Sequence, residues 1–559
     1  MSAQYDAIVV GSGITGGWAA KELTERGLRV LMLERGYPIE HGRDYRGEHK
    51  APWEFRFRGR GDRQRMLKEY PINSAIYAFR EGNEHFWAKD AEIPYTVADR
   101  REFAWHRSAG VGGRSLLWGR QVYRLSDLDF EANARDGHGI DWPLRYADLA
   151  PWYDHVEEFI GVSGRAEGLS HLPDGRFQPP MEFSCAEEHL KKHVETEYED
   201  RIVTIGRVAV LTEAKGERAA CHYCGPCHQG CSTGSYFSTQ SSTLPAARAT
   251  GRLTLRSDAL AERILYDKDT NRATGIRFVD TRSGERHEVR AGMLFLCAST
   301  IPTAQLLLHS RSEAFPQGFA NSSGVVGKFL MDHHLGTSAI GLLPTVRGRS
   351  VGKRPNGIYI PRFRNVDARH PDFVRGYGYQ GMGLQPDWEM ALSLPGFGAQ
   401  WKDAILGPRP WVMALSGFGE CLPYEHNRVT LDPAKTDRFG IPQPHIDMRW
   451  GENERAMRRD MAREAEAMLK AAGAVVLATD DSMSQPGEGV HEMGTARMGH
   501  DPADSALDPH NRTHDVPNVY ITDGSCMTSA ACQNPSLTWM ALTARATKHA
   551  AEAARRGFA

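Results

Sequence analysis

Residues 5–17, YDAIVVGSGITGG, decide the fold of the N-terminal part of the chain. The first six residues form a short, mostly apolar run that is typical of a buried strand. Gly11, Gly13 and Gly16 follow with the spacing G-x-G-x-x-G, and the next ten residues, WAAKELTERG after Gly17, favour a helix. This order predicts a strand–helix unit that binds the phosphates of a dinucleotide.

Each glycine of this motif has a different physical task. Gly11 permits the tight turn, Gly13 lets the backbone approach a pyrophosphate, and Gly16 lets helix and strand pack closely. The helix N-terminus offers free N–H groups to the phosphates. A second apolar run at 28–33 ends in Glu34, whose carboxylate is expected to accept hydrogen bonds from the adenosine ribose.

The composition of the chain limits its partners. The formal net charge is −2 over 559 residues, so no overall field attracts nucleic acid or an anionic membrane. No apolar run approaches the roughly 20 residues that a membrane span needs. Because the chain starts MSAQYDAIVV, we expect no export signal of its own. A periplasmic location would then require a signal-bearing partner, and the cytoplasm is the alternative.

Four further stretches carry a resemblance to a known family. They read AGVGGRSLLW (109–118), GVVGKFLMDHH (324–334), HEMGTARMG (491–499) and NVYITDGSCMTSAACQNPSLTWM (518–540). Together with the N-terminal motif they resemble the glucose–methanol–choline oxidoreductases, which bind FAD and oxidise alcohols. Residues 141–164 look like the bacterial sugar-dehydrogenase and pyranose-oxidase branch, and within it the specific expectation is a catalytic subunit of a glucoside 3-dehydrogenase.

The resemblance implies an α/β fold with two interleaved domains. One is a Rossmann-like FAD-binding domain, and the other is an α+β substrate domain built on an antiparallel sheet. We expect the FAD domain to comprise 1–165, 210–330 and 486–559, with 41–100 as a lid or a surface excursion. The substrate domain would comprise 166–209 and 331–485, and residues 221–231 would form a separate cysteine-rich loop.

Two residues are expected to carry the chemistry. Oxidation of an alcohol by a flavin requires a base for the hydroxyl proton, and histidine suits this because its ordinary pKa is about 6.5. His491 occupies the family position of that base, and Asn534 occupies the position of its partner. An amide cannot accept a proton at neutral pH, so Asn534 would orient the substrate oxygen and stabilise the alkoxide.

The resemblance also assigns flavin contacts. Those expected to hold FAD are Gly112, Gly113, Arg114, Ser115, Asp523, Gly524 and Pro535. Some relatives attach FAD through a histidine in the loop after the glycine pair, but this loop reads RSLLW, so noncovalent FAD is expected. Pro535 suits the start of a helix directed at the flavin. We assign His333 and His334 a structural role at a strand edge rather than a metal pair.

Residues 221–231, CHYCGPCHQGC, place Cys221, Cys224, Cys227 and Cys231 within one short loop. This C-x2-C-x2-C-x3-C spacing is that of bacterial-type ferredoxins. We therefore expect an iron–sulfur cluster, either 3Fe–4S or 4Fe–4S. Zinc and disulfides are the competing interpretations; structural zinc sites usually separate two CxxC pairs, and disulfides suit exported chains.

A cluster favours a dehydrogenase, because electrons must then leave the flavin singly. The expected reaction is oxidation of a secondary hydroxyl of a sugar or glycoside to a ketone, with C3 favoured. A cytochrome or similar carrier would accept the electrons, and a small accessory subunit is a further expected partner. The alternatives are an oxidase of the pyranose-oxidase type, a flavin fold kept only for binding, and an NAD-dependent dehydrogenase.

Overall fold

The computed structural model describes residues 5–348, 352–385, 395–406 and 410–556. Its first layer is a seven-stranded sheet centred on β1 (Tyr5–Val10). Parallel neighbours of β1 are β2 (Val30–Leu33) and β10 (Arg286–Leu296), and the parallel part is completed by β7 (Leu253–Arg256) and β18 (Val519–Ile521). The N-terminal half of β10 turns into an antiparallel extension with β9 (Arg272–Asp280) and β8 (Ala259–Asp267).

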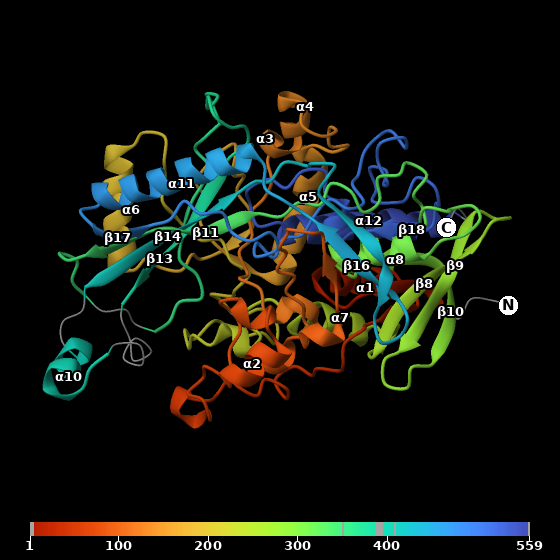
Figure 1. Ribbon diagram of the computed structural model, residues 1–559, viewed down its shortest axis with the longest axis horizontal. Coiled ribbons are helices and arrows are strands. Elements are labelled where there is room, and N and C mark those ends of the chain that lie inside the picture. Colours follow the sequence, from red (N-terminus) through yellow and green to blue (C-terminus); the bar gives the residue numbers. More distant parts are fainter. Residues whose placement is uncertain (1–4, 349–351, 386–394, 407–409, 557–559) are drawn as a thin grey trace.

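Helices from both ends of the chain cover this sheet. α1 (Ile14–Glu25) packs against α12 (Ser536–Arg555) and α7 (Thr243–Ala249), and α12 also packs against α5 (Tyr146–Ile160). Figure 1 shows the first helix in red beside the last one in blue. Ala19, Ala20 and Leu23 of α1 share a buried apolar cluster with Ala546 and Ala550 of α12, so the core of the nucleotide-binding unit includes the C-terminal helix.

The second layer is a six-stranded sheet in which the neighbouring strands pair antiparallel. Its order is β17 (Val475–Thr479), β11 (His334–Leu343), β14 (Trp411–Gly419), β13 (Tyr377–Leu384), β12 (Ile358–Ile360) and β6 (Thr204–Ile205). α11 (Glu452–Ala471) and α6 (Cys185–Glu197) cover one face, at the left of Figure 1. Tyr377 and Tyr379 are buried in the core on this helical side.

The remaining elements are short or peripheral. They are α2 (Arg63–Glu69), α3 (Asp127–Phe130), α4 (Ala132–Asp136), α8 (Thr300–His309), α10 (Gly398–Leu406), β3 (Thr96–Val97), β4 (Val162–Ser163), β5 (Phe177–Gln178), β15 (Arg428–Thr436) and β16 (Pro442–Asp447). β15, β16 and β3 form a small sheet, and α8 packs against it and β8.

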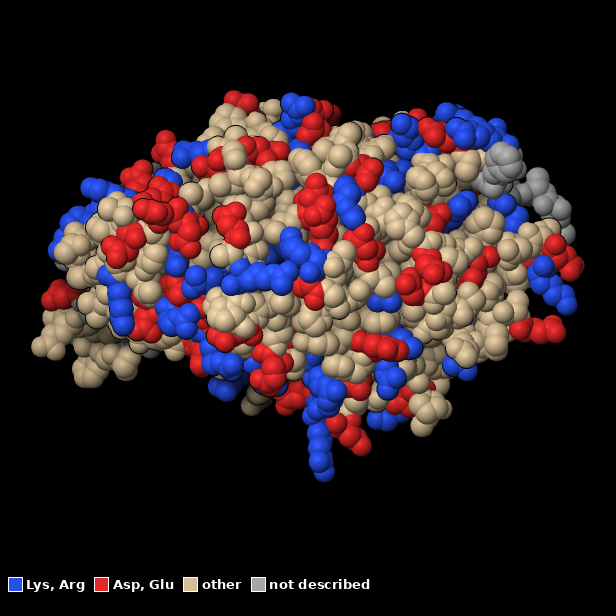
Figure 2. Space-filling view, turned by 90° about the horizontal axis from the view of Figure 1, so that it is seen from above, with Lys and Arg blue, Asp and Glu red and all other residues tan. Residues whose placement is uncertain are grey.

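The expected fold class is confirmed. A parallel Rossmann-like sheet and a six-stranded antiparallel sheet form the two halves of a mixed α/β molecule. No helix among the described residues is long and apolar enough to cross a membrane. The face in Figure 2 carries basic and acidic side chains side by side, in keeping with the net charge of −2.

Candidate active site

A cavity of about 920 Å³ extends from the first strand–helix turn to the antiparallel sheet. At one end it is lined by residues 10–15 and 33–37, where β1 and β2 end. At the other end it reaches strands β11, β13 and β14. The cavity therefore spans the two layers of the fold.

Packing explains two of the three motif glycines, and the cavity explains the third. A Cβ on Gly11 would lie 2.4 Å from the carbonyl oxygen of Cys297, and Gly11 has a φ of +97°. A Cβ on Gly16 would lie 2.0 Å from the carbonyl oxygen of Gly11. A Cβ on Gly13 would meet no atom within 4 Å, because Gly13 faces the cavity. Gly13 thus leaves room for a ligand, as expected from the motif.

Glu34 is held in place at the end of β2. Its Oε2 atom accepts hydrogen bonds from the amide and hydroxyl of Ser12, at 2.9 and 2.6 Å, and its Oε1 accepts one from the amide of Gly36. The hydroxyl of Ser12 also accepts a hydrogen bond from the amide of Gly112. The glycine turn, Glu34 and the loop at 112–113 consequently form one connected wall.

The residues of this wall fit FAD. Beside the open space at Gly13, two residues that line the cavity, His106 and Trp539, each have a buried ring nitrogen, Nδ1 and Nε1 respectively, with no hydrogen-bond partner among the described residues. Buried donors and acceptors are normally paired, so a ligand with polar edges would satisfy both. The cavity therefore offers a dinucleotide both space and unpaired polar groups.

The other expected flavin contacts lie around the same cavity, but not all of their side chains face it. Gly113, Arg114, Ser115, Asp523 and Gly524 line it. The carboxylate of Asp523 is occupied by Ser525 and Thr303, so only its backbone remains for a ligand. Gly112 and Pro535 do not line the cavity: the amide of Gly112 donates a hydrogen bond to Ser12, and Pro535 is the N-cap of α12, which begins at Ser536.

Arg114 brings positive charge beside His491. Its guanidinium donates two hydrogen bonds to the buried carboxylate of Glu492, at 2.6 and 3.1 Å, and another to the carbonyl oxygen of Val490. Charge-assisted pairs of this bidentate kind fix geometry strongly. The backbone on both sides of His491 is therefore anchored to the loop after Gly113.

His491 contacts a second histidine. Nδ1 of His491 lies 2.9 Å from Nδ1 of His333, and Nε2 of His333 lies 2.8 Å from the carbonyl oxygen of Ala531. His333 is fully buried, and burial lowers its pKa to about 4. Burial, then the neighbouring His333 and Arg114, lower the pKa of His491 well below its ordinary value. Both imidazoles are thus neutral at neutral pH.

This chain of contacts fixes where the protons lie. A carbonyl oxygen can only accept, so Nε2 of His333 carries a hydrogen and its Nδ1 holds a lone pair. Nδ1 of His491 must then donate to that lone pair. The remaining atom, Nε2 of His491, is left with its own lone pair, on a side chain that lines the cavity. Nε2 of His491 can therefore accept a proton.

The backbone is strained at both ends of the hydrogen-bonded series His491–His333–Ala531. Val490, directly before His491, has a φ of +54°, and Ala531 has a φ of +56°. A positive φ is unfavourable for a β-branched residue, and such strain collects at functional sites. The surroundings hold it: Asp332 accepts hydrogen bonds from the amides of Gly487, Gly489 and His491.

Asn534 is oriented from the antiparallel sheet. Nε2 of Gln380 on β13 donates a hydrogen bond of 2.7 Å to Oδ1 of Asn534. With its oxygen engaged, Asn534 has its NH2 group left to donate, and Asn534, Gln380 and His491 all line the same cavity. The site therefore combines a proton acceptor with a hydrogen-bond donor.

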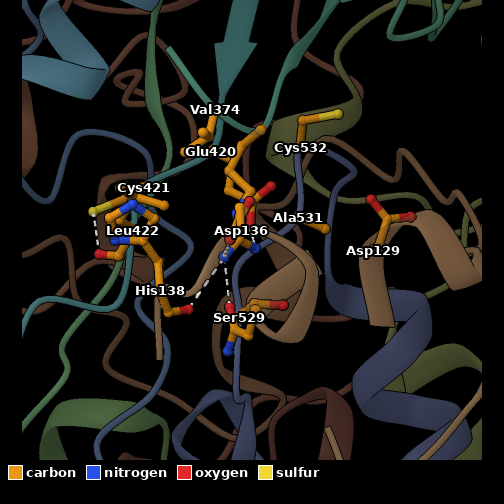
Figure 3. A network of polar contacts seen from close by, with 12 residues as sticks. Asp129, Asp136, His138, Val374, Glu420, Cys421, Leu422, Ser529, Ala531 and Cys532 are labelled. Atoms are coloured by element: carbon orange, nitrogen blue, oxygen red, sulfur yellow. Dashed lines mark hydrogen bonds and ion pairs between the residues drawn. The ribbon is translucent and has the colours of Figure 1, made fainter. Parts of the chain in front are cut away.

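A buried polar network supports the loop that ends at Asn534 (Figure 3). Arg375 is fully buried, and its guanidinium contacts Glu420, Asp136 and Asn133. Figure 3 shows Glu420, Asp136 and His138 grouped beside Ser529, Ala531 and Cys532. Further hydrogen bonds link the loop to its surroundings: Trp142 to Ser529, Asn133 to the carbonyl of Thr528, and Gln533 to Asp129. Residues 528–533 are thus tied to residues 129–142, and Arg375 links that stretch in turn to Glu420.

The four cysteines of residues 221–231 line one small cavity of about 20 Å³. No group of three His, Cys, Asp or Glu side chains in the described ranges is arranged to hold a metal ion. The thiols therefore surround a common space without forming a set of ligands. The loop lies close to the flavin-contact loop, because His228 contacts the carbonyl oxygen of Leu117 and lines the large cavity.

Three site residues were missed by the sequence analysis. His333 was given no catalytic role, yet it contacts His491; its position in an Asp-His-His run before a strand was the available signal. His106 and Gln380 carried no signal, because nothing in their neighbourhood in the sequence distinguishes them from other polar residues. Their importance follows only from where the fold places them.

Segment 41–100 lies over the cysteine loop and beside the cavity. Ser232 donates to Glu48, and Asn83 donates to the carbonyl oxygen of His228. Within the segment, Ile76, Tyr77 and Trp87 line the large cavity. Its expected function as a lid stays a prediction, as do the expected domain boundaries.

Comparison with known proteins identifies the family. Residues 5–335 and 423–543 match the two models of the GMC oxidoreductases. The chain is 30% identical to 2-methyl-1,2-propanediol dehydrogenase of Mycolicibacterium austroafricanum, over 97% of this chain and 94% of that protein. It is 26% identical to the fructose dehydrogenase large subunit of Gluconobacter japonicus, over 97% and 96% of the two chains.

A solved structure agrees on the fold. Pyridoxine 4-oxidase from Mesorbium loti superimposes with a TM-score of 0.60 at 16% identity, over 97% of this chain and 98% of that one. The two models together cover most of the sequence, and the chemistry of the cavity fits a flavin. The chain belongs to the GMC oxidoreductase family, and it is an FAD-dependent enzyme that oxidises CH–OH groups.

Proposed function

We propose that this enzyme is a dehydrogenase that oxidises a secondary hydroxyl of a sugar or glycoside to a ketone, with C3 favoured. The observation that carries the proposal is the pairing of a proton acceptor, Nε2 of His491, with a donor, the NH2 of Asn534, at one cavity. A hydroxyl group matches this pair, because its oxygen accepts from Asn534 while its hydrogen is donated to His491.

The chain's residues would divide the chemistry as follows. His491 removes the hydroxyl proton, and Asn534 holds the oxygen as negative charge develops on it. His333 keeps the lone pair of His491 toward the cavity. FAD, held by the glycine turn, Glu34 and the 112–115 loop, supplies a hydride acceptor when it is bound.

The cavity wall on the antiparallel sheet supports a neutral, hydroxyl-bearing substrate. The described lining residues of strands β11, β13 and β14 are all uncharged: Leu335, Gly336, Thr337, Gln380, Gly381, Met382, Ala414, Ser416 and Phe418. A cationic or anionic substrate would lack a partner on this wall. One relative is named for a diol and another for fructose, both of which are neutral polyhydroxyl compounds.

We further propose that electrons leave through an iron–sulfur cluster at Cys221, Cys224, Cys227 and Cys231, of the 3Fe–4S or 4Fe–4S type. The support is the spacing of the four thiols, their common cavity, and the contact of His228 with the flavin-contact loop. Since the described thiols do not converge as ligands, binding would require the loop to close around the cluster. Bound zinc is the competing outcome.

Electron transfer through such a cluster requires partner proteins. A cytochrome or similar carrier would take the electrons, and the relative named as a large subunit supports an accessory subunit. Such a subunit would also carry the export signal if the enzyme acts in the periplasm; without it we propose a cytoplasmic enzyme. An oxidase that uses dioxygen is the second candidate, supported by a 28% identical relative that is named as paromamine 6'-oxidase.

One experiment tests these proposals together. Purified holoenzyme is mixed anaerobically with methyl glucosides, free hexoses, a simple diol and gluconate, and its visible spectrum is followed. We expect the flavin to be bleached fastest by a glycoside or hexose, with a 3-keto product identified by mass spectrometry and NMR. Bleaching by none of the sugars would overturn the substrate proposal. Iron and acid-labile sulfide assays decide the cluster, and peroxide formed stoichiometrically in air would show an oxidase.

A further inference from the structure

A row of polar side chains crosses the cavity face of the antiparallel sheet. Gln380 of β13 is the register partner of Ser416 on β14, and Ser416 is the partner of Thr337 on β11. The hydroxyls of Thr337 and Ser416 lie 3.3 Å apart. All three residues line the cavity, so the row forms one polar rung on its wall.

The rung lies between apolar neighbours. On one side Phe418 and Leu335 are paired across the strands, and on the other side Met382 is paired with Ala414. Tyr379, the residue before Gln380, points to the opposite face, where its hydroxyl bonds to the carbonyl oxygen of Met461. The alternation of a strand therefore fixes Gln380 toward the cavity.

Gln380 ends the rung at Asn534. Its Nε2 donates to Oδ1 of Asn534 at 2.7 Å, and a carboxamide whose oxygen is engaged keeps its NH2 for other partners. Without this contact, Asn534 could turn its oxygen toward the substrate. An oxygen there would repel the negative charge that develops on the reacting hydroxyl, instead of stabilising it.

Gln380 lies outside the two segments of the chain that match the family models. The family models match residues 5–335 and 423–543, so β13 lies in the stretch between them. Asn534 lies inside the second matched stretch, whereas the residue that orients it does not. The orientation of Asn534 is thus supplied by a part of the chain that the family models do not cover.

We propose that Gln380 is a positioning residue that holds the carboxamide of Asn534 with its NH2 group toward the reacting hydroxyl. This inference rests on the proposed function of Asn534 as the donor to the substrate oxygen. It makes the face of the antiparallel sheet part of the machinery that sets the rate, rather than a passive wall.

The test compares two substitutions at one position. Q380M keeps the volume and loses the hydrogen bond, and the limiting rate of anaerobic flavin reduction should fall about tenfold, the equivalent of one hydrogen bond. Q380E should fall further, because an ionised carboxylate only accepts and draws the NH2 of Asn534 away from the substrate. At low pH the introduced carboxyl is protonated and can donate, so the rate of Q380E should recover toward that of wild type.

Matched controls separate positioning from general damage. Y379F removes one hydrogen bond from the adjacent residue on the helical face, and its limiting rate should equal that of wild type. In an N534A background, Q380M should have no further effect on the rate, because the two residues act through one contact. Additive losses in the double variant, or equal pH profiles for Q380E and Q380M, would overturn the inference.

An NMR measurement that needs no substrate oxidation tests the contact of Gln380 with Asn534 independently of the proposed function. In asparagine-labelled, deuterated protein, the side-chain 15NH2 resonance of Asn534, assigned with N534D, should shift in Q380M and stay in place in Y379F. If no hydroxyl substrate reduces wild-type flavin but this resonance shifts, the proposed function fails and the contact stands. An unmoved resonance overturns the inference whatever the substrate.

Discussion

The two ends of the cavity are built in different ways. At the nucleotide end, a continuous turn at 11–16 supplies backbone groups, and two of its glycines, Gly11 and Gly16, are required because backbone atoms lie less than 3 Å from where a Cβ would be. At the substrate end, the groups come from separate segments of the chain: the side chains of His333, Gln380, His491 and Asn534 and the carbonyl oxygen of Ala531. The first end is local in sequence, and the second exists only after both sheets have assembled.

The largest expected effect is a loss of activity from a substitution that alters the substrate end alone. H491A removes the proton acceptor, and the rate of anaerobic flavin reduction should fall by about 10²- to 10⁴-fold. FAD content should stay at the wild-type level, because His491 is not part of the glycine turn. Stopped-flow absorbance measures the rate. An unchanged rate in H491A would assign the base to another residue.

Two substitutions break the nucleotide end in different ways. G16A places a Cβ 2.0 Å from a backbone oxygen, so it should lower the free energy of unfolding by about 3 kcal/mol. In G13A the new Cβ would meet no protein atom within 4 Å, so the apoprotein should keep its Tm while FAD affinity falls. Calorimetry of apoprotein and fluorescence titration with FAD separate the two. Equal loss of stability in both variants would contradict this division.

A smaller effect should come from the second histidine. H333L removes the acceptor for Nδ1–H of His491 and frees the other tautomer, so flavin reduction should slow about tenfold. H333N keeps an acceptor near the same point and should recover part of the rate. The pH profile of the reduction rate should shift in H333L and return toward wild type in H333N. Identical profiles for the two variants would show that His333 acts only in packing.

The smallest expected effect on activity concerns His334. It is fully buried, neither ring nitrogen has a hydrogen-bond partner among the described residues, and burial lowers its pKa to about 3. Since the unfolded pKa is about 6.5, the neutral form's stabilisation is present above that pH and is lost as pH falls toward 3. One such histidine makes the free energy of unfolding fall by about 1.4 kcal/mol for each pH unit below about pH 6.

H334L should therefore flatten the fall in stability between pH 6 and pH 4. Denaturant unfolding at a series of pH values measures the slope, and flavin reduction at neutral pH should stay close to that of wild type. His333, whose pKa is about 4, titrates in a neighbouring range and remains in H334L, so a residual slope is expected. A slope identical to that of wild type would show that His334 does not govern acid stability.

The predictability of each end follows its construction. Gly11, Gly13, Gly16 and Glu34 could be assigned from sequence because their spacing is set within one turn and two strands. The family resemblance gave His491 and Asn534, and the structure brings both to one cavity. The parallel and antiparallel sheets were likewise expected, since the fold follows from the family motifs.

Contacts across distant segments were beyond sequence reasoning. The hydrogen bond between Gln380 and Asn534 depends on the register of β13, and the contact of His333 depends on the strained turn at Ala531. Neither register nor strain is encoded in a short motif. In the cysteine loop the sequence indicated more than the structure shows: the spacing of the cysteines predicts a metal cluster, but the described side chains form no set of three metal ligands.

The contact between α1 and α12 has a consequence for biosynthesis. A ribosome makes the glycine turn early, but Ala19, Ala20 and Leu23 of α1 lack their partners Ala546 and Ala550 until α12 emerges. Until then the growing polypeptide leaves these side chains without their final cover. The coenzyme cradle therefore gains its full support only once α12 has been made, and deleting α12 should leave the cradle without that support.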